Sequence, residues 1–232
     1  MANPTFELIK ELVPDYFYRS YGIIFRLKGY LKSIDFESKD ELLKSIFFIS
    51  IISIIGSLII VPVYINLKIN YSNGFFFALD TITTVFTYCG YAFIYHIIAK
   101  LLGGKGKFQE TLIVVLSSFA YAPLWWLTGV PFVRIYYKFL MTEDLINTQF
   151  YDKINSCIQP LSEHPVYYII MIIQSILLIL YARTLYIGIQ HIHNLKKIST
   201  FLVVFEGIII WIMGEYYLNP YVTQYICKGF KF

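Results

Sequence analysis

Five apolar runs of about 20 residues each constrain the fold of this chain more than any other feature. A helix of about 20 residues crosses the hydrocarbon core of a bilayer, so each run is long enough to span a membrane. With 57% hydrophobic and 15% charged residues among 232, a chain of this size could not bury so much apolar surface in water. The spans are expected at about 46–67, 78–102, 112–131, 166–188 and 200–218.

The sequence therefore predicts an all-α fold, a polytopic transmembrane helical bundle of five spans. Residues 1–40 would form a cytoplasmic or interfacial segment, 41–220 the membrane domain and 221–232 an outer tail. Most of the 19 Lys and Arg residues flank one side of these spans. Because positive loops stay inside, we expect a cytoplasmic N-terminus, an outside C-terminus and a location in the plasma membrane.

Local signals place some of the helix boundaries. Ser38 and Glu41 have the spacing of a capping box just before the first span. Pro165 suits the first turn of the fourth span. Pro62 and Pro123 lie inside spans and should kink them, because each proline removes a backbone hydrogen bond.

The N-terminal segment contains no span, but a helix is expected to start at Pro14 and to run through residues 16–33. Arg19 and Arg26, seven apart, would share one face of it. Two placements stay open. The helix could be amphipathic and lie in the cytoplasmic interface against anionic lipid, or it could pack under the bundle as its floor.

The stretch "GGKGK" between spans two and three could be a phosphate loop or a hairpin. A Walker loop needs Ser or Thr after its lysine and a preceding strand, and here Phe108 follows Lys107. The hairpin interpretation fits better, since Gly103 can end a helix and Gly104 and Gly106 allow a tight reversal. Lys105 and Lys107 would hold this loop in the cytoplasm and could contact lipid phosphate.

The segment "LLGGKGKFQETLIVVLSSFAYAPLWWL" resembles the central hairpin of the Yip1 domain family. The residues that carry the resemblance are Gly103, Gly104, Gly106, Phe108, Ala120, Tyr121, Ala122 and Pro123. The resemblance implies a five-span integral membrane protein without known catalysis, of the prokaryotic type. It also implies roles seen in relatives: eukaryotic members bind Rab GTPases in vesicle traffic, and some bacterial members act beside ABC-type exporters.

Polar residues within the spans are the candidate functional groups, because charge inside a membrane is costly. One face of span two forms a polar stripe that includes Asp80, Thr84, Thr87, Tyr88, Tyr91 and Tyr95. Arg183 and Glu206 lie at similar depths in the last two spans and are expected to pair. Glu215 could meet Asp80 and Arg134 near the outer side. These groups could serve helix packing or a substrate or proton path.

Other chemistry finds little support in the sequence. No catalytic motif, cofactor-binding motif or metal-ligand spacing stands out, and we expect no nucleic-acid partner. His191 and His193 are expected to be solvated in a loop. Cys157 and Cys227 both fall on the outer side, where a disulfide between them could form.

Two functions remain. The first is a membrane adaptor or scaffold that binds other membrane proteins, in keeping with the small residues Gly207 and Gly214 on one face of span five. The second is a small transporter or lipid-handling protein that uses the span-two stripe. An enzyme is the least supported class, and the bilayer itself is a partner in every case.

Overall fold

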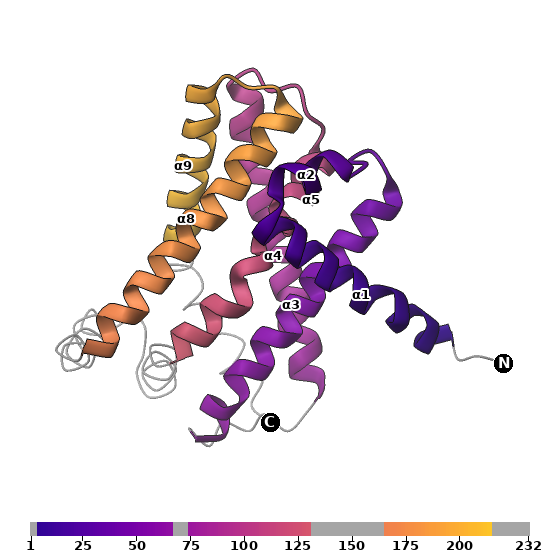
Figure 1. Ribbon diagram of the computed structural model, residues 1–232, viewed down its shortest axis with the longest axis vertical. Coiled ribbons are helices and arrows are strands. Elements are labelled where there is room, and N and C mark those ends of the chain that lie inside the picture. Colours follow the sequence, from indigo (N-terminus) through magenta and orange to yellow (C-terminus); the bar gives the residue numbers. More distant parts are fainter. Residues whose placement is uncertain (1–3, 67–73, 131–164, 215–232) are drawn as a thin grey trace.

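A computed structural model describes residues 4–66, 74–130 and 165–214. Every regular element in these ranges is helical, as the fold class predicts, and the helices form a bundle with α1 projecting from it (Figure 1). Residues 122–130 continue the chain as helix after η1. The elements are α1 (Pro4–Phe25), α2 (Leu27–Ser33), α3 (Lys39–Asn66), α4 (Gly74–Leu101), α5 (Phe108–Ser118), η1 (Phe119–Tyr121), α8 (Pro165–His193) and α9 (Lys197–Met213).

Four of the predicted spans correspond to helices that are long and apolar enough to cross a membrane: Lys39–Ile59, Thr81–Leu101, Phe108–Val130 and Pro165–His193. The fifth predicted span corresponds to α9, which is described over 17 residues. Its predicted continuation to residue 218 lies outside the described residues. The count of five spans therefore stays a prediction.

The helix boundaries follow local chemistry. Ser38 caps α3 by accepting a hydrogen bond from the backbone N–H of Glu41 at 3.4 Å. The other half of the predicted capping box is not made, because the Glu41 carboxylate binds Arg19 instead. Pro165 is the first residue of α8, as predicted. The third span changes to a 3₁₀ turn at η1 just before Pro123, which has no N–H to continue the α-helical ladder.

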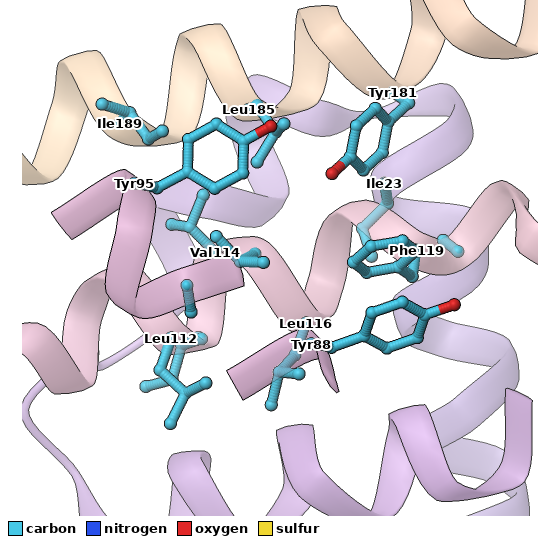
Figure 2. Packing of buried hydrophobic residues seen from close by; sticks show 14 of the residues in the cluster. Ile23, Tyr88, Tyr95, Leu112, Val114, Leu116, Phe119, Tyr181, Leu185 and Ile189 are labelled. Carbon is cyan, nitrogen blue, oxygen red and sulfur yellow. The ribbon is translucent and has the colours of Figure 1, made fainter. Parts of the chain in front are cut away.

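The centre of the bundle is α5 with η1. Every side chain from Thr111 to Tyr121 is buried, and this segment contacts α3, α4 and α8. Figure 2 shows Leu112, Val114 and Leu116 among the aromatic rings and aliphatic side chains of the neighbouring helices. The third span is thus shielded from lipid by its neighbours over its first half.

Close approach of α9 to α4 depends on the small residues predicted to form a packing face. A Cβ on Gly207 would overlap the ring of Tyr95, and one on Gly214 would lie 2.7 Å from the Tyr91 hydroxyl. The glycine face of α9, considered from the sequence as support for an adaptor, thus packs against α4 within this chain.

The N-terminal helix packs against the bundle through one face. It begins at Pro4, earlier than predicted, and it ends at Phe25, so that Arg19 and Arg26 do not share a face. Arg19 is buried, whereas Arg26 lies exposed between α1 and α2. Contacts of α1 with α3, α5 and η1 make it part of the bundle floor.

Candidate functional site

The α4–α5 hairpin and the helix ends around it carry many of the hydrogen bonds that join different helices. We call this end of the bundle the hairpin end. Gly103 has a φ of +86°, the left-handed conformation that ends α4. Its N–H donates to the carbonyl of Lys100, and the N–H of Gly104 donates to the carbonyl of Ala99. The N–H of Lys105 reaches across to the carbonyl of His193 at the end of α8, at 3.0 Å. The hairpin therefore terminates one helix and binds the end of another.

His193 occupies a socket formed by the two further glycines of this hairpin. A Cβ on Gly104 would lie 2.6 Å from His193 Nδ1, and a Cβ on Gly106 would lie 3.1 Å from the same atom. The imidazole is fully buried. Both histidines lie in the last turn of α8 rather than in the expected loop. His191 is exposed, as expected, whereas the expectation that His193 is solvated is wrong.

A single hydroxyl joins two histidines from different helices. The Thr111 Oγ1 lies 2.8 Å from His193 Nε2 and 3.0 Å from His96 Nδ1. It also donates to the carbonyl of Lys107 at 3.2 Å. A hydroxyl has one proton and two lone pairs, so both imidazole nitrogens must donate to it when the Lys107 bond is made. This hydrogen bonding links α4, α5 and α8 and fixes one tautomer of each histidine.

Two lysine side chains at the hairpin, those of Lys100 and Lys107, bind protein groups. Lys107 forms an ion pair with Glu37, which precedes α3, and this hydrogen bond lowers the pKa of the Glu37 carboxyl. Lys100 donates to the carbonyl of Lys105. The Glu110 carboxylate accepts the N–H of Lys107 at 2.7 Å, which caps α5. Because amides of the loop already bind protein carbonyls and a carboxylate, the structure agrees with a hairpin rather than a phosphate loop.

The remaining residues of the Yip1-like motif also make packing contacts. The Phe108 ring lies 5.7 Å from His96, centroid to centroid. The Tyr121 hydroxyl donates to the carbonyl of Ile23 at 3.3 Å, so it binds a carbonyl in the last turn of α1. Pro123 lies two residues after the end of the 3₁₀ turn at Tyr121.

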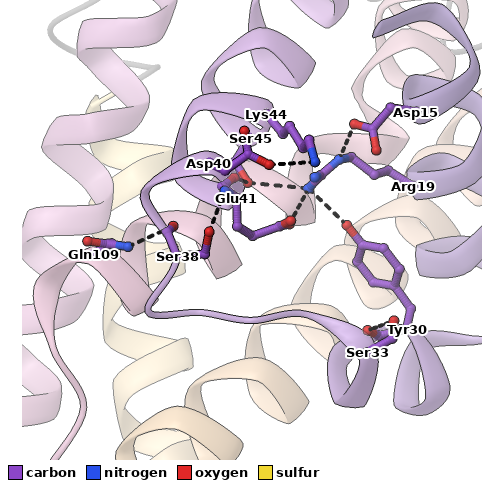
Figure 3. A network of polar contacts seen from close by, with 10 residues as sticks. All are labelled: Asp15, Arg19, Tyr30, Ser33, Ser38, Asp40, Glu41, Lys44, Ser45 and Gln109. Atoms are coloured by element: carbon purple, nitrogen blue, oxygen red, sulfur yellow. Dashed lines mark hydrogen bonds and ion pairs between the residues drawn. The ribbon is translucent and has the colours of Figure 1, made fainter. Parts of the chain in front are cut away.

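A second polar cluster centres on Arg19 of α1 (Figure 3). Its guanidinium forms ion pairs with Asp15 and with Glu41 of α3, the latter at 2.7 Å, and it donates to the Tyr30 hydroxyl at 3.2 Å. Burial would lower the pKa of Arg19, but these partners raise it above its ordinary value, so the side chain stays charged. Burial raises the pKa of Tyr30, which stays neutral. The cluster joins α1, α2 and α3.

The polar stripe of α4 divides into packed and less buried residues. The Tyr88 ring stacks on Phe119 with centroids 3.7 Å apart (Figure 2). Tyr95 is fully buried, and its ring lies against Gly207 of α9. Thr84 is half-buried and Thr87 is exposed. The side chain of Asp80 lies outside the described residues. The half of the stripe nearer the hairpin is therefore part of the helix packing.

The predicted Arg183–Glu206 pair does not form. The ion pairs among the described residues lie at the hairpin end, and both of these side chains are exposed. Arg183 lies on the side of α8 opposite the buried Tyr181 and Leu185. On α9, Trp211 contacts α8 through Tyr181, and Glu206 is more than a third of a turn around the helix from it. The two residues lie at similar distances along their helices from the α8–α9 connection, but their side chains point away from each other.

Several candidate residues fall outside the described part of the chain, namely Glu215, Arg134, Cys157 and Cys227. The described Cys89 is a free thiol in α4. Within residues 4–66, 74–130 and 165–214 no group of three or more His, Cys, Asp or Glu side chains could hold a metal ion. The described geometry thus offers structural polar clusters and outward-facing charges.

An all-helical architecture with at least four apolar helices of membrane-spanning length defines a multi-pass integral membrane protein. The family model of the Yip1 domain matches residues 22–214, and the chain belongs to the Yip1 domain family. The match begins in α1 and includes the hairpin, the Arg19-paired start of α3 and all of α9. No curated protein and no solved structure matches the chain.

Proposed function

We propose that this protein is a membrane adaptor, a non-enzymatic Yip1-type protein that binds another integral membrane protein through the outward faces of α8 and α9. The proposal rests on two separate exposed charges, Arg183 in α8 and Glu206 in α9. Each lies about three helical turns from the hairpin end of its helix. A charge at that depth needs a partner, because lipid chains provide none.

The surroundings of the two charges favour a protein partner within the membrane. Arg183 continues an exposed stripe of Ile172, Ile176 and Ile179 on α8, which is the surface that faces the bilayer. Glu206 has the exposed neighbours Phe205 and Ile209. A partner would therefore present an apolar helix with a carboxylate at the depth of Arg183 or a cation at the depth of Glu206.

The resemblance to bacterial members of the family supports our choice of partner class. Some bacterial Yip1-type proteins act beside ABC-type exporters, and we propose a transporter of this kind as the partner. The N-terminus would be cytoplasmic and the C-terminus outside, with five spans in the plasma membrane. The hairpin end, with Lys100, Lys105 and Lys107, is then the cytoplasmic end.

Crosslinking with matched variants tests the adaptor function. A photoreactive residue at Ile179, beside Arg183, should capture one membrane protein at fixed stoichiometry in native membranes. The variants Arg183→Gln and Glu206→Gln should lose that crosslink, while Lys105→Gln, an exposed charge in the hairpin, should keep it. A crosslink that survives both variants, or one only between copies of this chain, would contradict the proposal.

The alternative, a small transporter or lipid-handling protein, has less support. It needs the α4 stripe to line a path, and Tyr88 and Tyr95 are packed in the core. The exposed Thr87 is the described group that best fits such a path. Uptake of a solute by vesicles that contain the purified chain alone would favour this alternative.

A further inference from the structure

The face of α1 that points away from the bundle carries four large exposed side chains. Phe17, Tyr18, Tyr21 and Phe25 are 65%, 60%, 50% and 71% exposed. At 100° per residue these four positions fall within about 100° of the helix circumference, so they form one continuous aromatic face. The opposite side holds Arg19 and Ile23, which are almost fully buried.

The charges next to the aromatic face have one sign. Between Pro14 and Ser33 every exposed charged residue is a cation: Arg26, Lys28 and Lys32. The one carboxylate in this stretch, Asp15, is in an ion pair with Arg19. The Arg26 guanidinium lies over the Tyr21 ring, 5.7 Å from its centroid, so the basic and aromatic groups adjoin.

The contacts of α1 place this face at the level where the first span begins. Arg19 is paired with Glu41 in the first turn of α3, and the Tyr16 ring lies 5.4 Å from the ring of Phe48, centroid to centroid. The candidate span of α3 extends from Lys39 to Ile59. The aromatic face therefore lies at the level of the first half of a helix that is long and apolar enough to span a membrane.

We infer that the aromatic face of α1 and the basic residues Arg26, Lys28 and Lys32 form a binding surface for anionic lipid headgroups. Tyr and Phe rings prefer the headgroup layer, and cations near it attract anionic lipid. The buried face holds α1 to the bundle, while the opposite face binds lipid, so both placements considered from the sequence apply to one helix. This surface is separate from the outward charges of α8 and α9.

Depth measurement by electron paramagnetic resonance tests the inference. The full chain, with Cys89, Cys157 and Cys227 replaced by Ser, carries one nitroxide label at residue 21 and is placed in vesicles of phosphatidylcholine or of phosphatidylcholine with phosphatidylglycerol. Matched labels at Lys105, exposed in the hairpin, and Ile179, exposed on α8, define the water and hydrocarbon limits. The label at 21 should show oxygen and nickel-reagent accessibilities between these limits.

The basic residues are tested in the same system. Phosphatidylglycerol should lower the accessibility of the label at 21 to the water-soluble nickel reagent. The triple variant Arg26→Gln, Lys28→Gln, Lys32→Gln should lose that response, and Lys105→Gln should keep it. The inference is overturned if the label at 21 matches the one at 105, if it shows dipolar broadening from a second copy, or if the triple variant still responds to phosphatidylglycerol.

Discussion

At the residue scale, the glycines of the hairpin are explained by what lies against them. Gly103 adopts a left-handed conformation. At Gly104 and Gly106 a side chain would collide with His193, so glycine is needed for space. The sequence indicated a turn, but not the histidine that fills it. A signal for His193 was present, since it continues the buried positions Leu185 and Ile189 at intervals of four on α8.

Substitution of Gly104 should show how tightly this socket is packed. In Gly104→Ala the new Cβ would meet His193 Nδ1 at 2.6 Å and the Ala99 carbonyl oxygen at 2.7 Å. We expect a loss of about 1–3 kcal/mol in the free energy of unfolding, measured by chemical or thermal unfolding in detergent. The matched control is Gly90→Ala in α4, which has open space around its Cβ and should be neutral or slightly stabilising. Equal effects at the two positions would contradict the socket.

The Arg19 cluster gives a second prediction at this scale. Arg19→Leu would leave the partly buried Glu41 carboxylate without its cation, and we expect a loss of about 3 kcal/mol or more in the free energy of unfolding. Lys44→Gln removes the exposed pair with Asp40 and should cost about 0–1 kcal/mol. Unfolding curves of the two variants in the same detergent provide the comparison. An Arg19→Leu variant as stable as Lys44→Gln would show that the cluster does not hold α1.

At the element scale, apolar length and proline position were sufficient to predict the four helices of membrane-spanning length. The run at 166–188 became α8 starting at Pro165, and the third span tightens before Pro123. The direction in which a polar side chain points from its helix was harder to predict, because it depends on which face of the helix each neighbouring helix contacts. For that reason the predicted Arg183–Glu206 pair failed, even though both residues lie at similar distances from the adjoining ends of α8 and α9. The role of Arg19 was missed because its partner Glu41 was assigned to a capping box.

Thr111 should couple three helices through its hydroxyl. Thr111→Val keeps the shape of the side chain but leaves the buried His193 Nε2 and the neighbouring His96 Nδ1 without their shared partner. We expect a cost of about 1–3 kcal/mol and faster hydrogen exchange at the adjoining ends of α4 and α8. The control is Thr184→Val, where a buried hydroxyl bonds only to the Leu180 carbonyl of its own helix. If both variants exchange alike, Thr111 does not link the helices.

At the scale of the whole molecule, a network of hydrogen bonds and ion pairs joins different helices at the hairpin end of the bundle. The hairpin, the end of α8, the start of α3 and the α1–α2 segment are joined there by Lys107–Glu37, by Gln109 bound to the carbonyls of Phe36 and Ser38, and by Tyr121 bound to Ile23. The helices below this end present apolar surfaces to lipid, with the charges of α8 and α9 as exceptions. The molecule thus combines one rigid polar end with lateral faces available for contacts within the membrane.

The orientation of that rigid end provides the last prediction. A cysteine replacing the exposed Lys105, in a chain without native cysteines, should react with a membrane-impermeant maleimide only after the cytoplasmic side is opened. A cysteine added after Phe232 should react in intact cells. In the five-span topology an odd number of spans separates residue 105 from the C-terminus, so the two cysteines lie on opposite sides of the membrane. A chain with four spans would give both cysteines the same reactivity, since residues 105 and 232 would then lie on one side. Opposite reactivity with residue 105 outside would keep the five spans and overturn the cytoplasmic placement of the hairpin end.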